Sequence, residues 1–137
     1  MAVVAKEALI HAPLEKVFGL AVLKPEDRWR TVKTKIQVSS SWPRPGATLM
    51  VLSRNTVVVE VLEHAPPTRH VEDVKGWGKV TWSFLPEGTD TRVRLEVYYK
   101  DTMWPFRPMD WILQAPSWRR ELGQILEGLK LRAEGLR

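Results

Sequence analysis

The residues of this chain that could carry out metal or acid–base chemistry are few and scattered. There are three histidines, His11, His64 and His70, and there is no cysteine. No histidine pairs with another histidine, a cysteine or a carboxylate at metal-ligand spacing, and no EF-hand or facial-triad pattern occurs. We therefore expect no metal ion and no cofactor. His11 lies at a predicted strand-to-helix junction and is expected at the surface.

Two acidic neighbours and one tyrosine are the remaining candidates for catalysis. Glu72 and Asp73 are adjacent on a predicted strand, so their side chains point to opposite faces and cannot act as a pair. Tyr99 shares a predicted inward face with Val93 and Leu95, and its hydroxyl could donate or accept a proton, or instead reach solvent at the strand end. No nucleotide loop or nucleophile elbow occurs. The sequence predicts no dedicated catalytic residue, with Tyr99 as the candidate if the protein is an enzyme.

Aromatic side chains are the strongest signal for a binding site. The chain has seven tryptophans in 137 residues. Indole rings either fill a core or line a pocket, where they offer apolar surface and one N–H donor. The residues expected to line such a pocket are Phe18, Trp29, Trp82, Phe84, Tyr99, Trp104, Trp111, Trp118 and Leu122.

The segments that would position these side chains are mostly strands. Alternation of apolar and polar residues, bounded by Pro, Gly and Ser-rich turns, predicts strands over 3–10, 32–38, 47–54, 56–63, 69–74, 79–85 and 91–100. Strands that follow one another without long helices between them favour an antiparallel sheet. Pro13 suits the first turn of a short helix after the first strand, and residues 27–29 form either a second short helix or a turn.

A long amphipathic helix closes the chain. From Trp111, apolar residues recur at helical spacing and form one stripe: Trp111, Ala115, Trp118, Leu122, Ile125, Leu129 and Ala133. Asp110 is expected to cap this helix, and Pro116 either kinks it or starts a new helix. One helix covers only a strip of a large curled sheet, so the remaining volume must hold large side chains or a ligand.

The segment from Met103 to Met109 is a proline-punctuated apolar loop. One interpretation is a gate that touches a membrane transiently during ligand exchange. The other is a loop folded over the end of the core.

Length, composition and charge limit the classes of function. A chain of 137 residues predicts one domain, 1–137. The start of the chain lacks the pattern of a signal peptide, and no apolar run could span a membrane, so we expect a cytoplasmic protein. The formal net charge is +5, but the densest basic run alternates with apolar residues like a solvated strand edge, and we expect no nucleic-acid partner. One asparagine and ten prolines fit a thermophilic source.

Several short motifs resemble the START-like superfamily, also called helix-grip or SRPBCC proteins, and within it the polyketide cyclase/dehydrase and lipid transport group. The matching segments are Ile10-His11-Ala12-Pro13 with Val17-Phe18, Pro45-Gly46, Trp82-Ser83-Phe84-Leu85-Pro86, Gly88-Thr89-Asp90-Thr91-Arg92-Val93 and Leu129-Lys130-Leu131-Arg132-Ala133-Glu134. The resemblance implies an α+β helix-grip fold: a curved antiparallel sheet of about seven strands around a long C-terminal helix, with two short helices after strand one. It also implies a hydrophobic cavity between sheet and helix.

Three functions follow from this resemblance and from the residues. The first is a monomeric or homodimeric carrier or sequestering protein for a small hydrophobic molecule that is lipid-, polyketide- or aromatic-like. The second is a cyclase- or dehydratase-like enzyme that uses the same cavity. The third is a macromolecular interaction protein without a working cavity. The fold does not decide among them.

Overall fold

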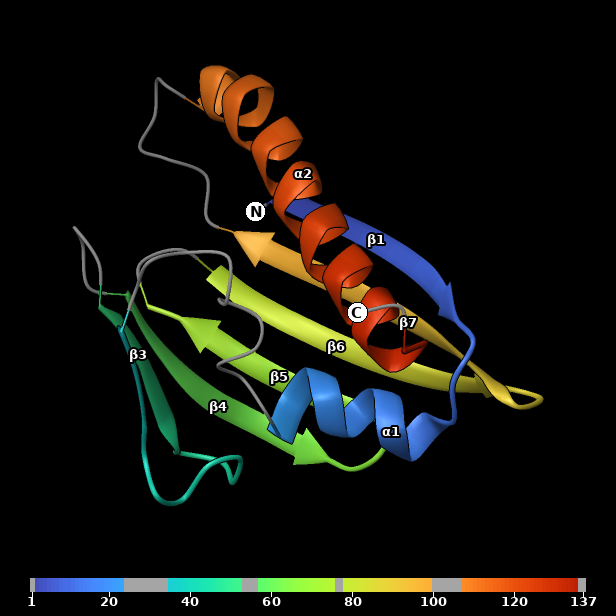
Figure 1. Cartoon of the computed structure of the whole chain (residues 1–137). Coiled ribbons are helices and arrows are strands. Elements are labelled where there is room, and N and C mark those ends of the chain that lie inside the picture. Colours follow the sequence, from blue (N-terminus) through green and yellow to red (C-terminus); the bar gives the residue numbers. More distant parts are fainter. Residues whose placement is uncertain (1, 24–34, 53–56, 76–77, 100–106, 136–137) are drawn as a thin grey trace.

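A curved, seven-stranded antiparallel sheet carries the helices on one of its faces (Figure 1). The computed structural model describes residues 2–23, 35–52, 57–75, 78–99 and 107–135, and only the backbone of Ala2, Tyr99, residues 107–118 and Glu121. The strands are β1 (Ala2–Ile10), β2 (Lys35–Val38), β3 (Thr48–Leu52), β4 (Val57–Ala65), β5 (Arg69–Val74), β6 (Gly78–Glu87) and β7 (Asp90–Tyr99). The helices are α1 (Leu14–Phe18), the π-helical segment η1 (Gly19–Leu23) that continues it, and α2 (Arg107–Ala133).

Most strands of the sheet pair with their neighbours in sequence. The order is β1-β7-β6-β5-β4-β3-β2, so β2 to β7 form successive hairpins and only β1 pairs with a strand distant in sequence. Antiparallel neighbours need only short turns. In the turn between β6 and β7, Gly88 has φ of +63°, a left-handed conformation that glycine adopts without steric cost. The predicted helix-grip arrangement is confirmed.

The main core lies on the inner face of the sheet, which we define as the face that α1 and α2 cover (Figure 1). Three residues of β7 are fully buried there: Val93, Leu95 and Val97. Arg94, between two of them, is exposed, as strand alternation requires. From α2, four buried residues enter the same cluster: Leu122, Leu126, Leu129 and Ala133. Ile125 packs against this core only partly buried, so Leu126 takes the central place that the periodicity assigned to Ile125.

The C-terminal helix starts earlier than its apolar stripe predicts. It begins at Arg107 instead of Trp111 and continues through Asp110 and Pro116. The predicted cap at Asp110 and a new helix at Pro116 are therefore wrong. Pro108 falls in the first turn, where backbone N–H groups have no partner within the helix, so a proline there does not oppose the helix. The end of the predicted loop, Arg107 to Met109, is helical, whereas its other residues lie outside the described parts.

A second, smaller cluster lies on the inner face near the other edge of the sheet. Leu49, Val51 and Val59 form its buried centre. Trp42, in the turn between β2 and β3, packs on this cluster, and its indole Nε1 donates a hydrogen bond to the carbonyl of Val22 at 2.9 Å. This bond ties the turn to η1. The inner face thus has two apolar clusters, and the strip between them, on β4 and β5, carries polar side chains.

Among the helices that the structure describes, none is long and apolar enough to cross a membrane.

Candidate functional site

Three titratable side chains form a hydrogen-bonded row between the two apolar clusters, which we call the inner polar chain: His64, His70 and Glu72. The Nδ1 atoms of His64 and His70 lie 3.1 Å apart, and Nε2 of His70 lies 2.9 Å from Oε2 of Glu72. The side chains of His70 and Glu72 are 0% and 3% exposed, whereas His64 is half-buried. The row therefore leads from the interior to a group that solvent or a ligand can reach.

The register of the strands brings these residues together. His70 and Glu72 occupy alternate positions of β5, so both face inward. His64 on β4 pairs directly with His70 across the hairpin. A bulge in β4 between Val61 and Glu63 adds Leu62 to one strand. Because such an extra residue shifts the alternation of side chains, Val61 and His64 both face inward although three positions separate them in sequence.

Aromatic rings surround the inner polar chain. The ring of Phe18, from α1, lies 5.6 Å from that of His64, and the indole of Trp42 lies 5.9 Å from His70. Phe18 also meets Phe84 edge-on at 5.0 Å, and Phe84 stacks parallel to Trp82 at 6.0 Å. Apolar walls with a few placed polar groups are the usual composition of a site for small molecules.

The environment disfavours a positive charge on His64. Burial, and the neighbouring charge of His70, lower the pKa of His64 below its ordinary value of 6.5. Neutral imidazole both donates and accepts hydrogen bonds. At neutral pH His64 is therefore an uncharged polar group within an apolar strip.

The structure brings some of the predicted pocket residues together. Phe18, Trp82, Phe84 and Leu122 are all buried in the main cluster. Trp29 and Trp104 lie outside the described residues. For Tyr99 on β7, and for Trp111 and Trp118 on α2, only the backbone is described. These nine residues stay predictions as ligand contacts.

The inner polar chain itself was missed, because the sequence analysis looked for partners of the histidines only at metal-ligand spacing. Two signals in the sequence pointed to it. The spacing His70-Val71-Glu72 on a strand places a histidine and a carboxylate on one face. His64 and His70 also stand at equal distances from the ends of the turn that joins β4 to β5. Among the described residues, no group of three or more His, Asp and Glu is arranged to hold a metal ion.

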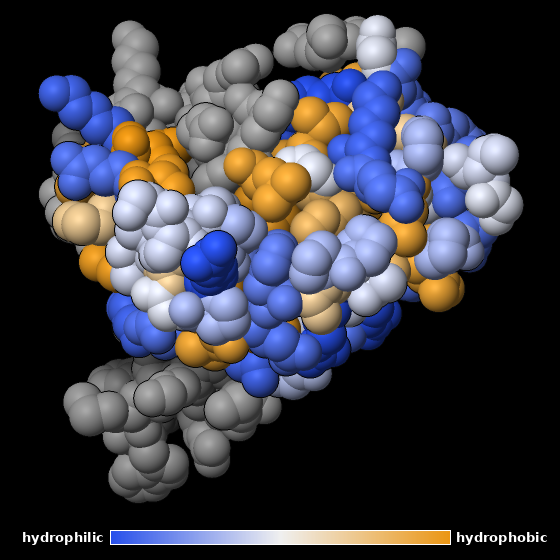
Figure 2. Space-filling view, turned by 90° about the horizontal axis from the view of Figure 1, so that it is seen from below, coloured by the Kyte–Doolittle hydropathy of each residue, from blue (hydrophilic) through white to orange (hydrophobic). Residues whose placement is uncertain are grey.

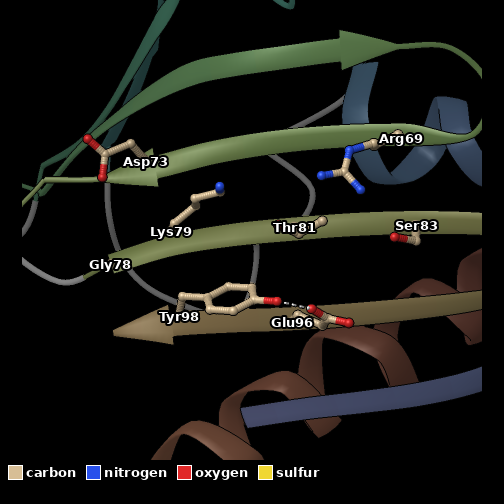
Figure 3. A pocket seen from close by; sticks show the side chains of 8 residues that line it. All are labelled: Arg69, Asp73, Gly78, Lys79, Thr81, Ser83, Glu96 and Tyr98. Carbon is tan, nitrogen blue, oxygen red and sulfur yellow. Dashed lines mark hydrogen bonds between the residues drawn. The ribbon is translucent and has the colours of Figure 1, made fainter. Parts of the chain in front are cut away.

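A second candidate site lies on the opposite, outer face of the sheet. This depression, the outer trough, has a volume of about 350 Å³ and runs along β6 between β5 and β7 (Figure 3). It is hollow because Gly78, Thr81 and Ser83 are small, while the flanking strands carry longer side chains. The lining residues are Arg69, Asp73, Gly78, Lys79, Thr81, Ser83, Glu96 and Tyr98.

Charges in the outer trough largely neutralise one another. The hydroxyl of Tyr98 donates to Glu96 at 2.9 Å, and Arg69 lies 3.1 Å from Glu63. Hydrogen bonds from Arg94 and from Tyr98 hold the pKa of Glu96 below its ordinary value. Lys79 has no ion pair with any other described residue. The trough is thus a solvent-open surface of paired charges, whereas the inner polar chain is enclosed, and we take the inner chain as the better candidate site.

The exposed apolar side chains of the described residues are scattered. On the face seen from below in Figure 2, apolar side chains appear as separate areas between polar ones. The large apolar residues that are most exposed among those described come from different elements: Val3, Leu23, Val38, Leu62 and Leu85. Apolar residues scattered in this way are ordinary for a protein surface.

Comparison with known proteins identifies the fold. No family model matches the chain, and no curated protein matches it. Many solved structures share its architecture. The protein TTHA0849 of Thermus thermophilus has a TM-score of 0.74 at 23% identity over 98% of this chain and 99% of its own. The protein BH1534 of Bacillus halodurans has a TM-score of 0.73 at 15% identity over 98% of both chains.

A third similar structure is the Aha1 dimer of Colwellia psychrerythraea, with a TM-score of 0.67 at 16% identity over 98% of this chain and 97% of that one. The structural similarity over nearly the whole length of each chain establishes the shared helix-grip fold, although the sequence identities are low. They do not establish a shared ligand or reaction.

Proposed function

We propose that this protein binds a small, mainly apolar molecule on the inner face of its sheet, as a carrier or sequestering protein of the START-like superfamily. The observation that carries the proposal is the inner polar chain, which ends in half-buried His64 beside the ring of Phe18, while Trp42 lies beside His70. The helix-grip fold and the sequence motifs of that superfamily support it.

The chemistry of this strip suits a ligand with a large apolar body and one hydrogen-bonding group. Burial of apolar surface supplies about 25 cal/mol per Å² before the costs of ordering. The polar group would meet His64, because His70 and Glu72 lie deeper and already bond to each other. Apolar contacts would come from the ring of Phe18 beside His64, and from the other predicted pocket residues that lie in the main cluster of the inner face.

Native mass spectrometry of the purified protein, followed by denaturing extraction, tests this function directly. We expect a stoichiometric small apolar molecule, or binding of an added one. His64→Gln should weaken binding by up to about tenfold, since one hydrogen bond is worth about 0.5–1.5 kcal/mol. Lys79→Ala, in the outer trough, is the matched control and should leave binding unchanged.

Two results would contradict the proposal. One is a protein that carries no molecule and binds no apolar probe. The other is binding that Lys79→Ala abolishes and His64→Gln leaves intact, which would move the site to the outer trough.

An enzyme that uses the same strip is the second candidate. The inner polar chain favours it, because two imidazoles and a carboxylate in hydrogen-bond contact can hold and move a proton. A cyclase- or dehydratase-like reaction would then use His64 as the group nearest the substrate. Tyr99 stays the candidate that the sequence predicts.

A further inference from the structure

The inner polar chain begins at the buried carboxylate of Glu72 and ends at the half-buried imidazole of His64. We infer that the ligand of the inner face is a weak acid, such as a phenol, an enol or a carboxylic acid, and that its proton passes into this chain on binding. The inference rests on the proposed function, because it names the chemical class of that ligand.

With Glu72 ionised and both histidines neutral, one assignment of protons to the ring nitrogens satisfies the two hydrogen bonds. Glu72, as a carboxylate, can only accept, so Nε2 of His70 donates to it over 2.9 Å. Neutral His70 then has a bare Nδ1, which accepts a hydrogen bond from Nδ1 of His64 over 3.1 Å. Neutral His64 is left with a bare Nε2. The outer end of the chain is therefore a hydrogen-bond acceptor and a base.

A weak acid can complete this arrangement by a balanced transfer of protons. The ligand O–H bond breaks, and its proton forms a bond to Nε2 of His64. The proton on Nδ1 of His64 moves to Nδ1 of His70. His64 ends neutral with Nε2–H donating to the ligand oxygen, His70 becomes an imidazolium, and the total charge of the site is unchanged.

The positive charge belongs on His70 because of what surrounds each ring. His70 lies between the carboxylate of Glu72 and, through His64, the ligand anion, so the charges alternate in sign. Both His70 and Glu72 are almost fully shielded from water, which strengthens their attraction. The lowered pKa of His64 agrees with this assignment, because burial and the charge of His70 both disfavour a cation there.

The neighbours of the inner polar chain on the adjacent elements are apolar or aromatic. Across the ladders, Glu72 lies opposite Val61 and Val80, and His70 lies opposite Trp82 on β6. Phe18 of α1 lies beside His64, while Glu15 and Lys16 of that helix are exposed. Trp42, from the β2–β3 turn, lies beside His70. The valine, phenylalanine and tryptophan side chains cannot take up a proton, so the transferred proton stays among the members of the inner polar chain.

The positions of the protons on the histidine rings can be tested without any ligand, by long-range ¹H–¹⁵N NMR as the pH is lowered. We expect His64 protonated on Nδ1 and His70 on Nε2 at high pH. On acidification, His64 should change to the Nε2–H form before its own ring becomes an imidazolium. Glu72→Gln should abolish this change of tautomer. A His64 that carries its proton on Nε2 at high pH, or becomes an imidazolium without that change, would overturn the inference.

The transfer itself can be tested with 4-nitrophenol, whose absorbance distinguishes phenol from phenolate, against the neutral analogue 4-nitroanisole. The wild type should bind nitrophenol as the phenolate at a pH where the free dye is largely protonated, and at least tenfold more tightly than nitroanisole. His64→Gln and Glu72→Gln, checked for folding by circular dichroism, should reduce that ratio toward one. Lys79→Ala should preserve it.

The outcomes separate the two proposals. Binding of nitrophenol as the neutral phenol, or equally tight binding of both dyes, would overturn the weak-acid inference and leave the proposed function standing. Binding of neither dye would count against the proposed function. The NMR experiment would still decide whether the protons of the inner polar chain lie on the nitrogen atoms that we infer.

Discussion

At the scale of single residues, Glu72 and Asp73 show how one step along a strand changes the chemistry of a carboxylate. Glu72 is buried and bonded to His70, whereas Asp73 faces the outer side and lies 3.0 Å from Lys75. Both positions follow from the alternation of side chains. A buried hydrogen bond stabilises modestly by itself, but the loss of one partner leaves the other buried group unsatisfied.

The two neighbours therefore make a matched pair of variants. Glu72→Ala should lower the free energy of unfolding by about 1–3 kcal/mol, because it leaves the buried Nε2–H of His70 without an acceptor. Asp73→Ala should change it by less than about 1 kcal/mol, as expected for an exposed ion pair. Urea denaturation at pH 7 measures both. Equal losses for the two variants would contradict the inward placement of Glu72.

At the scale of elements, the end of α2 is fastened to the junction between β1 and α1. The backbone N–H of His11 donates to Oε2 of Glu134 at 2.9 Å, and Nζ of Lys130 donates to the carbonyl of Leu9 at 3.1 Å. His11 also lies 3.2 Å from Asp90, in the turn between β6 and β7. Three segments distant in sequence thus meet at one end of the helix.

This junction should weaken in acid. The hydrogen bond from His11, with the nearby charge of Lys130, lowers the pKa of Glu134 below 4.5. Since the folded-state pKa is depressed, the stabilisation is fully present above pH 4.5 and is lost as the pH falls through the folded-state pKa. Glu134→Gln should lower Tm at pH 6, and the difference from wild type should shrink progressively as the pH falls below 4.5. Glu127→Gln, at an exposed position of α2, should show no such effect. A difference that stays constant as the pH falls would contradict the assignment.

At the scale of the whole molecule, ion pairs neutralise part of the positive net charge in the described parts of the chain. The formal charge is +5. Several of the described cations nevertheless stand beside carboxylates, for example Arg92 at 2.7 Å from Glu87 and Lys75 at 3.0 Å from Glu60. Nucleic-acid binding needs many phosphate contacts from unpaired Lys and Arg. We therefore keep the prediction that this protein has no nucleic-acid partner.

Fluorescence anisotropy with a labelled 20-base-pair duplex checks this prediction. At about 150 mM salt we expect no saturable binding, because scattered paired charges release few counterions. Arg92→Glu, as a control, should make no difference at that salt concentration. Saturable binding that falls steeply with added salt would instead support the third hypothesis, a macromolecular interaction protein.

The fold could be predicted from the sequence because its determinants are local. Alternation in segments such as 91–100 assigned strands and their inward faces, and the recurrence of Leu122, Leu129 and Ala133 assigned a helix on the core. Turn residues such as Gly88 separated the strands. The start of α2 escaped prediction because a proline in the first helical turn cannot be distinguished from a loop proline by its type alone.

The candidate site depended on tertiary structure, because it is made by pairing across strands. The spacing of His70 and Glu72 in the sequence is enough to place them on one face. Their contact with His64 also needs the β4–β5 register and the bulge at Leu62. The aromatic surroundings need α1 and the β2–β3 turn to fold over the same strip. Local patterns thus determine which way a side chain points, and only the closed sheet determines which side chains meet.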